Sequence, residues 1–164
     1  ICFGDAVKLT DAGATTTIQK DTGTTSLTPI GIFMGVRYTD LSTGQTQFSQ
    51  VWSGAAHTNG MVYVNDDPNL LFEIQADGAV NNDDLAANCA VVQGTSNATL
   101  GISRVSLDIS TAATTAALPI RIVDWKGGYD GDEYGTAYPI MLCKWNTGHQ
   151  LGIGVVSGAA PSAA

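Results

Sequence analysis

Residues Gly60 to Val80, GMVYVNDDPNLLFEIQADGAV, hold two apolar runs of strand length on either side of a dense turn. The runs are Met61 to Val64 and Leu70 to Ile74. Asn65 to Asn69 lie between them, and the chain must bend there, because Asp and Asn bond to their own backbone and Pro fixes φ. Gly78 supplies a second turn. The stretch predicts a β-hairpin arm that leads into a core strand.

Strand patterns recur along the rest of the chain. Residues 30–39 and 46–52 flank a polar turn that contains Gly44, and together they predict a second hairpin. Further strand patterns cover residues 89–92, 104–109, 118–125 and 138–146. The single helix that we expect is residues 82–88, about two turns long. Roughly eight to ten strands without a tandem repeat predict an all-β fold, an antiparallel β-sandwich or barrel of the jelly-roll kind.

Composition divides the chain into three parts. Residues 1–29 are rich in Thr and poor in large apolar side chains, which favours an extended N-terminal arm, either solvated or laid on a neighbouring subunit. Residues 30–156 carry the strand patterns and form the β domain. Residues 157–164 contain Gly, Ala, Ser and Pro, and we expect a flexible C-terminal tail.

The charge of the chain excludes several classes of function. Charged residues make up 13% of the sequence, against about 25% in an ordinary soluble protein. There are 15 acidic and 7 basic residues, and the basic ones do not cluster. Direct binding to nucleic acid is therefore not expected. No apolar run reaches the length of a membrane-spanning helix, so no membrane partner is expected either. The uncharged surface is either covered by other subunits or rich in Thr, Ser and Asn.

Cysteine and histidine residues give no clear reaction centre. Cys2, Cys89 and Cys143 are odd in number and lack metal-ligand spacing, so we expect no disulfide framework. Cys89 and Cys143 lie in apolar runs, where we expect buried free thiols. His57 and His149 are the only histidines, and neither lies beside a nucleophile motif. A pairing of Cys143 with His149 is conceivable in space, but a buried Cys and an exposed loop His is the simpler expectation.

Acidic residues offer two further candidates. The loop Asp130 to Glu133 places carboxylates at alternate positions, as a calcium loop does, but the terminal bidentate Glu is missing. We expect a solvated loop there, and neither a metal nor a cofactor. Asp66, Asp67, Asp83 and Asp84 could form the carboxylate pair of a glycoside hydrolase. Turn chemistry explains the first two of these sufficiently.

Aromatic residues offer a ligand-stacking surface. Trp125, Tyr129 and Tyr134 lie close together in sequence, and with Trp52 and Trp145 they could stack on a sugar. Two of the three tryptophans end predicted strands, where an aromatic side chain more often closes a core. A carbohydrate-binding module is therefore the alternative function.

The order of several segments resembles a known group of proteins. These segments are GIFMGVRYTD (31–40), TQFSQVW (46–52), VYVNDDPNLLFEIQADGAV (62–80), RVSLDIST (104–111) and LPIRIVDW (118–125). They are similar to small virion structural proteins of tailed phages, especially phages of aquatic hosts, and DDPNLLFEIQADG is the most specific piece. The resemblance covers about residues 30 to 149 and implies a capsid decoration, or cement, protein.

The resemblance implies a non-enzymatic β domain on the outer capsid surface, commonly a homotrimer at local threefold positions, that clamps adjacent major capsid protein subunits. It implies no catalytic residue. We expect residues 1–29 to cross onto the capsid or a neighbouring copy. The residues expected at these contacts are Thr15, Thr16, Thr17, Ile18, Thr24, Thr25 and Leu27. The alternative is a head-fibre or carbohydrate-binding adhesion module on the virion surface, in which Trp125, Tyr129 and Tyr134 bind the ligand.

Overall fold

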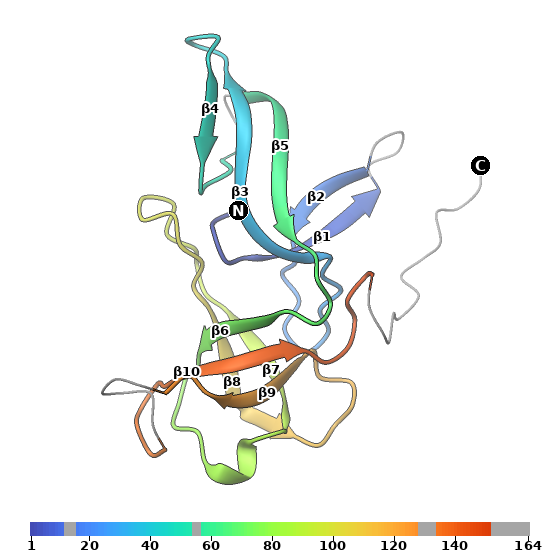
Figure 1. The fold of residues 1–164 in the computed structure, drawn as a ribbon, viewed down its shortest axis with the longest axis vertical. Coiled ribbons are helices and arrows are strands. Elements are labelled where there is room, and N and C mark those ends of the chain that lie inside the picture. Colours follow the sequence, from blue (N-terminus) through green and yellow to red (C-terminus); the bar gives the residue numbers. More distant parts are fainter. Residues whose placement is uncertain (12–15, 54–56, 128–133, 152–164) are drawn as a thin grey trace, which may run out of the picture. The chain divides into compact units, whose positions relative to one another are not determined.

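The structure is a computed structural model that describes residues 1–11, 16–53, 57–127 and 134–151. These residues form ten strands and one short 3-10 turn, and they contain no α-helix (Figure 1). All pairings between neighbouring strands are antiparallel. The predicted all-β, antiparallel fold class is therefore confirmed.

The chain divides into two compact units whose sequences interleave. The first unit contains Ile1–Asp21, Pro29–Asp66 and Thr95–Arg104, and the second contains Thr22–Thr28, Asp67–Gly94 and Val105–Ala164. The chain thus passes between the units five times, after residues 21, 28, 66, 94 and 104. Residues 1–29, for which the sequence predicts an extended arm, are shared between both units.

The first unit is built on a five-stranded sheet with a long central strand. The strands are β1 (Ala6–Asp11), β2 (Thr16–Lys20), β3 (Gly31–Asp40), β4 (Thr46–Ser49) and β5 (His57–Asn65). Their order is β2-β1-β3-β4, and β5 pairs with β3. In Figure 1, β3, β4 and β5 run side by side. The predicted hairpin between residues 30–39 and 46–52 is confirmed by the pairing of β3 with β4.

One face of this sheet carries the core of the first unit. Val7, Phe33 and Val36 are almost fully buried together, and Ile18 and Trp52 pack against them. β3 contains irregularities between residues 33 and 35 and between residues 37 and 39. Because a bulge adds one residue to a strand, Phe33 and Val36 both face the core although three positions separate them.

The second unit is built on a five-stranded sheet of its own. The strands are β6 (Leu71–Gln75), β7 (Asn88–Gln93), β8 (Val105–Ala113), β9 (Ile120–Trp125) and β10 (Ile140–Trp145), in the order β6-β10-β9-β7-β8. Cys143 lies opposite Ile122, and Cys89 lies opposite Ile120. Directly opposite residues share a face, so all four line one face of this sheet, and all are buried.

The hairpin predicted for residues 61–74 is wrong. The turn forms as expected, because the Asp67 carboxylate accepts a hydrogen bond from the Asn69 N–H at 2.8 Å. The flanking strands, however, separate: β5 pairs with β3, and β6 pairs with β10. The local pattern predicted strands and a bend correctly, while long-range pairing determined the partner of each strand.

The helix predicted for residues 82–88 is also wrong. Only Asn82–Asp84 form a single 3-10 turn, in which the Asp84 carboxylate accepts a hydrogen bond from the Asn81 N–H at 2.8 Å. Ala86 has φ 62° and β7 begins at Asn88, so the helix cannot continue. A short acidic segment before a buried strand has no apolar face of its own to bury.

Candidate functional site

The aromatic residues expected to bind a ligand are partly brought together. Trp125 and Tyr134 meet edge to face, with ring centroids 6.4 Å apart and an interplanar angle of 81°. Trp125 is half-buried at the end of β9, and Tyr134 is exposed. Tyr129 lies outside the described residues. Two of the three aromatic residues named from the sequence therefore contact each other in the second unit.

Trp52 and Trp145 have core positions. Trp52 packs against the core cluster of the first unit. Trp145 is 8% exposed and packs against Phe72, with ring centroids 4.9 Å apart. Neither tryptophan belongs to the pair formed by Trp125 and Tyr134, because neither makes a ring contact with it in the part of the chain described.

The residues expected at contacts with a partner fall into several environments. Thr17 and Ile18 lie in β2, where Thr17 is exposed and Ile18 packs against the core. Thr16 is the first residue of β2, and Thr15 lies outside the described residues. Thr24 and Thr25 are exposed, and Leu27 is buried within the second unit. The exposed members Thr17, Thr24 and Thr25 are those whose side chains a partner can reach.

The two histidines occupy different units and different surroundings. The His57 ring lies 3.8 Å from the Tyr38 ring, centroid to centroid, at an interplanar angle of 33°. Its Nε2 atom lies 3.3 Å from the Ser53 hydroxyl. His149, expected on an exposed loop, is instead buried next to Trp145, and its Nδ1 atom accepts a hydrogen bond from the Leu151 N–H. The expectation is wrong because the loop folds back against β10.

A hollow in the second unit lies beside His149. Its volume is about 530 Å³, and its walls are Pro68, Asn69, Lys144, Trp145, Asn146, Thr147, His149 and Leu151. Among the residues that the structure describes, no carboxylate lines it. Asp67 and Asp84 are engaged in local turns, as described above. Hydrolysis of a glycosidic bond needs two carboxylates across a cleft, and the described walls of this hollow provide none.

Metal ligands do not gather in the part of the chain that the structure describes. No group of three or more His, Cys, Asp or Glu side chains stands close enough there to hold an ion. The acidic loop of residues 130–133, which we expect to be solvated, lies outside the described residues.

The three cysteines are buried and free, which confirms the burial predicted for Cys89 and Cys143. Burial raises the pKa of the Cys89 thiol to about 12, and the nearby Asp84, Asp108 and Asp77 raise it further. Burial also raises the pKa of Cys143 well above its usual range. Since the thiolate is the reactive form, neither side chain is suited to act as a nucleophile at neutral pH.

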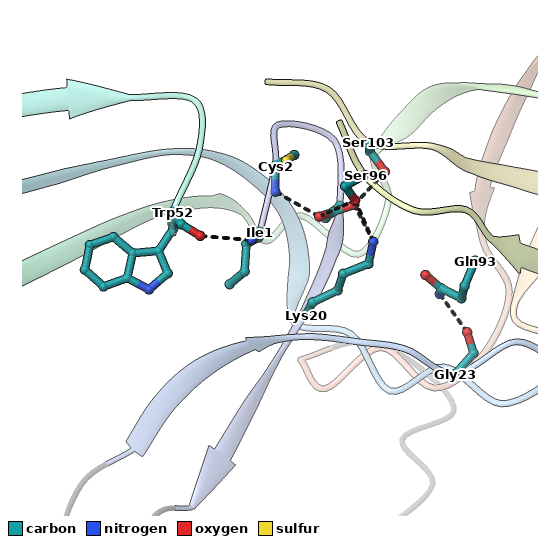
Figure 2. A network of polar contacts seen from close by, with 9 residues as sticks. Ile1, Cys2, Lys20, Gly23, Trp52, Gln93, Ser96 and Ser103 are labelled. Carbon is teal, nitrogen blue, oxygen red and sulfur yellow. Dashed lines mark hydrogen bonds and ion pairs between the residues drawn. The ribbon is translucent and has the colours of Figure 1, made fainter. Parts of the chain in front are cut away.

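Sequence reasoning missed a polar network around Asp5 in the first unit. Asp5 is fully buried, and four groups donate hydrogen bonds to its carboxylate (Figure 2). Lys20 Nζ lies 2.9 Å from Oδ1, the Ser103 hydroxyl 2.6 Å from Oδ1, and the Cys2 N–H 2.8 Å from Oδ2. The Ser96 hydroxyl contacts both oxygens at 3.2 and 3.3 Å. The network joins the first residues of the chain to β2 and to the loop of residues 95–104.

The Asp5 carboxylate is ionised in this setting. Burial alone would raise its pKa, but the hydrogen bonds from Ser103, the Cys2 N–H and Lys20 outweigh burial, so that its pKa is lowered. The sequence held a signal for this site: Asp5 is the one charged residue between Phe3 and Val7, and a charge in an apolar run must find partners when it is buried.

The network is suited to structure and not to catalysis. Lys20 Nζ also lies 2.9 Å from the Ser96 hydroxyl, a spacing that serine-lysine hydrolases use. In such enzymes the lysine must take the proton of the serine. Here Lys20 donates to both Asp5 and Ser96, and the Ser96 proton is directed at Asp5. Ser96 is therefore not activated by Lys20.

Large apolar side chains lie exposed on both units. Eight exposed large apolar residues belong to the first unit and six to the second, counted over the described residues. Among the most exposed are Phe48 at 71%, Leu41 and Leu100 at 62% each, and Met61 at 58%. Single exposed apolar side chains are ordinary, but a group of them on one surface marks a site of interaction.

Two further observations bear on the kind of protein this is. Within the described residues, no helix has the length and apolar character needed to cross a membrane. Comparison with family models, with curated proteins and with solved structures finds no match for this chain.

Proposed function

We propose that this chain is a capsid decoration protein, which binds the outer surface of a tailed-phage head and stabilises the contacts between major capsid protein subunits. The observation that carries the proposal is the large number of exposed apolar side chains on a chain with only 13% charged residues. A surface of this composition is suited to being covered by another protein. The resemblance of residues 30–149 to virion structural proteins supports the same function.

The proposed activity needs no reaction centre. A protein that binds the assembled shell and not its loose subunits stabilises the shell by mass action. Many modest contacts, repeated by the symmetry of the shell, then add up through multivalency. In this proposal the copies form a homotrimer at the local threefold positions of the head, and the partner is the major capsid protein.

The experiment that tests the proposal starts from virions of the phage that encodes this chain. The chain should purify with intact heads in a fixed ratio to the major capsid protein. Heads from which it is deleted should lose their genome at a lower temperature, and adding the purified protein should restore the original temperature. A chain missing from purified heads, or heads equally stable without it, would refute the proposal.

Deleting residues 1–29 is not a clean test of an N-terminal contact. The deletion would remove β1, β2 and Asp5, and with them part of the core of the first unit. Substituting the exposed side chains Thr17, Thr24 and Thr25 by Asp tests the same contact without removing core residues. If these residues contact the shell, the triple variant binds more weakly than wild type; equal binding would place the contact elsewhere.

A carbohydrate-binding adhesion module is the second candidate function. The pairing of half-buried Trp125 with exposed Tyr134 favours it, because the Tyr134 ring is accessible to stack on a sugar ring. A glycan array would show specific binding that Trp125→Ala abolishes. If the array shows no specific binding, the carbohydrate-binding function is refuted and the decoration function remains as the single candidate.

A further inference from the structure

The first sheet has one face that packs on the core and one that points away from it. The face that points away also carries large apolar side chains. Arg37 on β3 stands directly opposite Phe48 on β4 and Met61 on β5. Opposite residues share a face, so the three side chains form a row across the strands. Tyr63 lies two residues beyond Met61 on β5 and therefore points to the same side. Phe48, Met61 and Tyr63 are all exposed.

The irregularity in β3 adds a further side chain to this face. Phe33 and Val36 both face the core, so Met34 and Gly35 between them lie on the outer side, and Met34 is exposed. Gly35 stands opposite Tyr63 and has φ +144°, in the region that favours glycine. Gly35 is itself buried, and a side chain there would approach the Ser49 carbonyl oxygen. We call Met34, Arg37, Phe48, Met61 and Tyr63 the outer face.

The composition of the outer face is that of the centre of a protein interface. Aromatic residues, Met and Arg are enriched at interface cores, whereas Lys, Glu and Asp are depleted there. The outer face holds two Met, a Phe, a Tyr and one Arg, and none of the depleted charges. Residues of these types also contribute most of the hot spots found by alanine scanning.

The single charge of the outer face points to the kind of partner. Arg37 is exposed, and no carboxylate within the described part of the chain lies within ion-pair distance of it. Covering this face buries the guanidinium, and a buried guanidinium needs an acceptor from the partner. The partner must therefore present a carboxylate among apolar side chains.

A second copy docked face to face does not fit this requirement. A two-fold contact joins the outer face of one copy to the outer face of the other. The outer face holds no acidic side chain, so the Arg37 of each copy would be buried without a carboxylate to pair with it.

We infer that the outer face is the surface by which the chain binds the shell, with Arg37 paired to a carboxylate of the major capsid protein and Phe48 and Met61 packed on apolar side chains around it. This inference rests on the proposed function and names the part of the molecule that performs it. It places the contact on β3, β4 and β5, and not on the Thr-rich segments of residues 15–27.

The experiment measures binding of purified variants to heads prepared without the chain. Phe48→Ser, Met61→Ser and Arg37→Glu each remove one feature of the outer face. Leu100→Ser and Arg104→Glu are matched controls, since both side chains are exposed on the same unit but lie in or next to the loop of residues 95–104. Co-sedimentation with the heads gives the dissociation constant of each variant.

We expect each outer-face variant to bind about 30-fold more weakly than wild type, and both controls to bind within about twofold of it. All five side chains are exposed, so thermal unfolding of the free variants should match that of wild type. A charge-reversed partner gives a second test: an Asp→Lys or Glu→Lys substitution on the capsid protein should restore binding to Arg37→Glu.

The outcomes separate the inference from the function on which it rests. If wild type binds the heads and the outer-face variants bind equally well, the inference is overturned and the decoration function stands. If wild type does not bind the heads at all, the proposed function fails. If Phe48→Ser instead converts an oligomer of the free protein into a monomer, measured by light scattering, the outer face joins copies of the chain and the inference is overturned.

Discussion

Replacing Asp5 by Asn should destabilise the protein strongly, because it breaks the polar network in the first unit. The amide keeps nearly the same shape but removes the negative charge that Lys20 faces at 2.9 Å. It also replaces one accepting oxygen by an NH₂ group, which then meets the Cys2 N–H in one orientation of the amide or the Lys20 ammonium in the other. A donor facing a donor in a buried site loses its hydrogen bond without gaining water.

The size of the effect follows from burial. Removing one partner of a buried ion pair costs roughly 3 to 5 kcal/mol. The Lys20 side chain is 21% exposed and can recover part of its hydration, so we expect the low end, about 3 kcal/mol. In a chain of 164 residues this lowers Tm by about 6 to 12 °C.

An ion pair in the second unit provides the matched control. Lys126 Nζ and Glu73 Oε2 also lie 2.9 Å apart, but their side chains are 40% and 51% exposed. Glu73→Gln should cost no more than about 0.5 kcal/mol, because water screens an exposed pair. Differential scanning calorimetry at neutral pH compares both variants with wild type. Equal losses for the two variants would refute the claim that burial makes the Asp5 pair stronger.

The pH dependence of the unfolding free energy is an independent test of the Asp5 site. The pKa of Asp5 in the folded chain lies below its usual 3.8, so as the pH falls the unfolded chain takes up the proton first. The contribution of Asp5 to stability is therefore complete above about pH 4 and is lost as the pH falls through the folded pKa. Since Asn does not titrate, the stability gap between wild type and Asp5→Asn should narrow below about pH 4. A gap that stays constant down to about pH 2 would show that the carboxylate is not the source of the effect.

Two further predictions concern the second unit and the turns. Gly148→Ala should destabilise the protein by at least about 2 kcal/mol more than Gly44→Ala. Both glycines have positive φ (+81° and +70°), but only at Gly148 would the new Cβ collide with a backbone atom, the Leu27 carbonyl oxygen. Equal unfolding free energies of the two variants in urea would contradict this prediction. Cys89 and Cys143 should resist an aromatic disulfide reagent at pH 8 until denaturant is added, and rapid labelling of both thiols in the native protein would show that the strands carrying them open readily.

Local sequence patterns predicted the strands better than their partners. The alternation of residues 30–39 predicted β3 almost to the residue, and the Asp67 turn formed as its side chains required. The partner of β5 was predicted wrongly because two apolar runs separated by a short turn have the sequence pattern of a hairpin. Strand pairing depends on packing across the whole chain, which an alternating pattern does not specify.

The candidate surfaces were predicted less well than the fold. Phe48 alternates with polar neighbours as a core residue does, yet it is 71% exposed. The bulge that brings Met34 to the same side of β3 has no local sequence signature beyond Gly35. The aromatic pair of Trp125 and Tyr134 was found because its members are neighbours in sequence. Asp5, whose partners Ser96 and Ser103 lie more than 90 residues away, could not be placed from its surroundings.

The interleaving of the two units has a consequence for synthesis in the cell. Asp5 leaves the ribosome well before Ser96 and Ser103, which emerge only after β6 and β7 of the other unit have been made. The first unit therefore cannot complete its polar network until residue 103 has been made, 98 residues after Asp5. Neither half can be cut out as an independent piece, and a fragment that ends before residue 95 should remain unfolded or bound to chaperones.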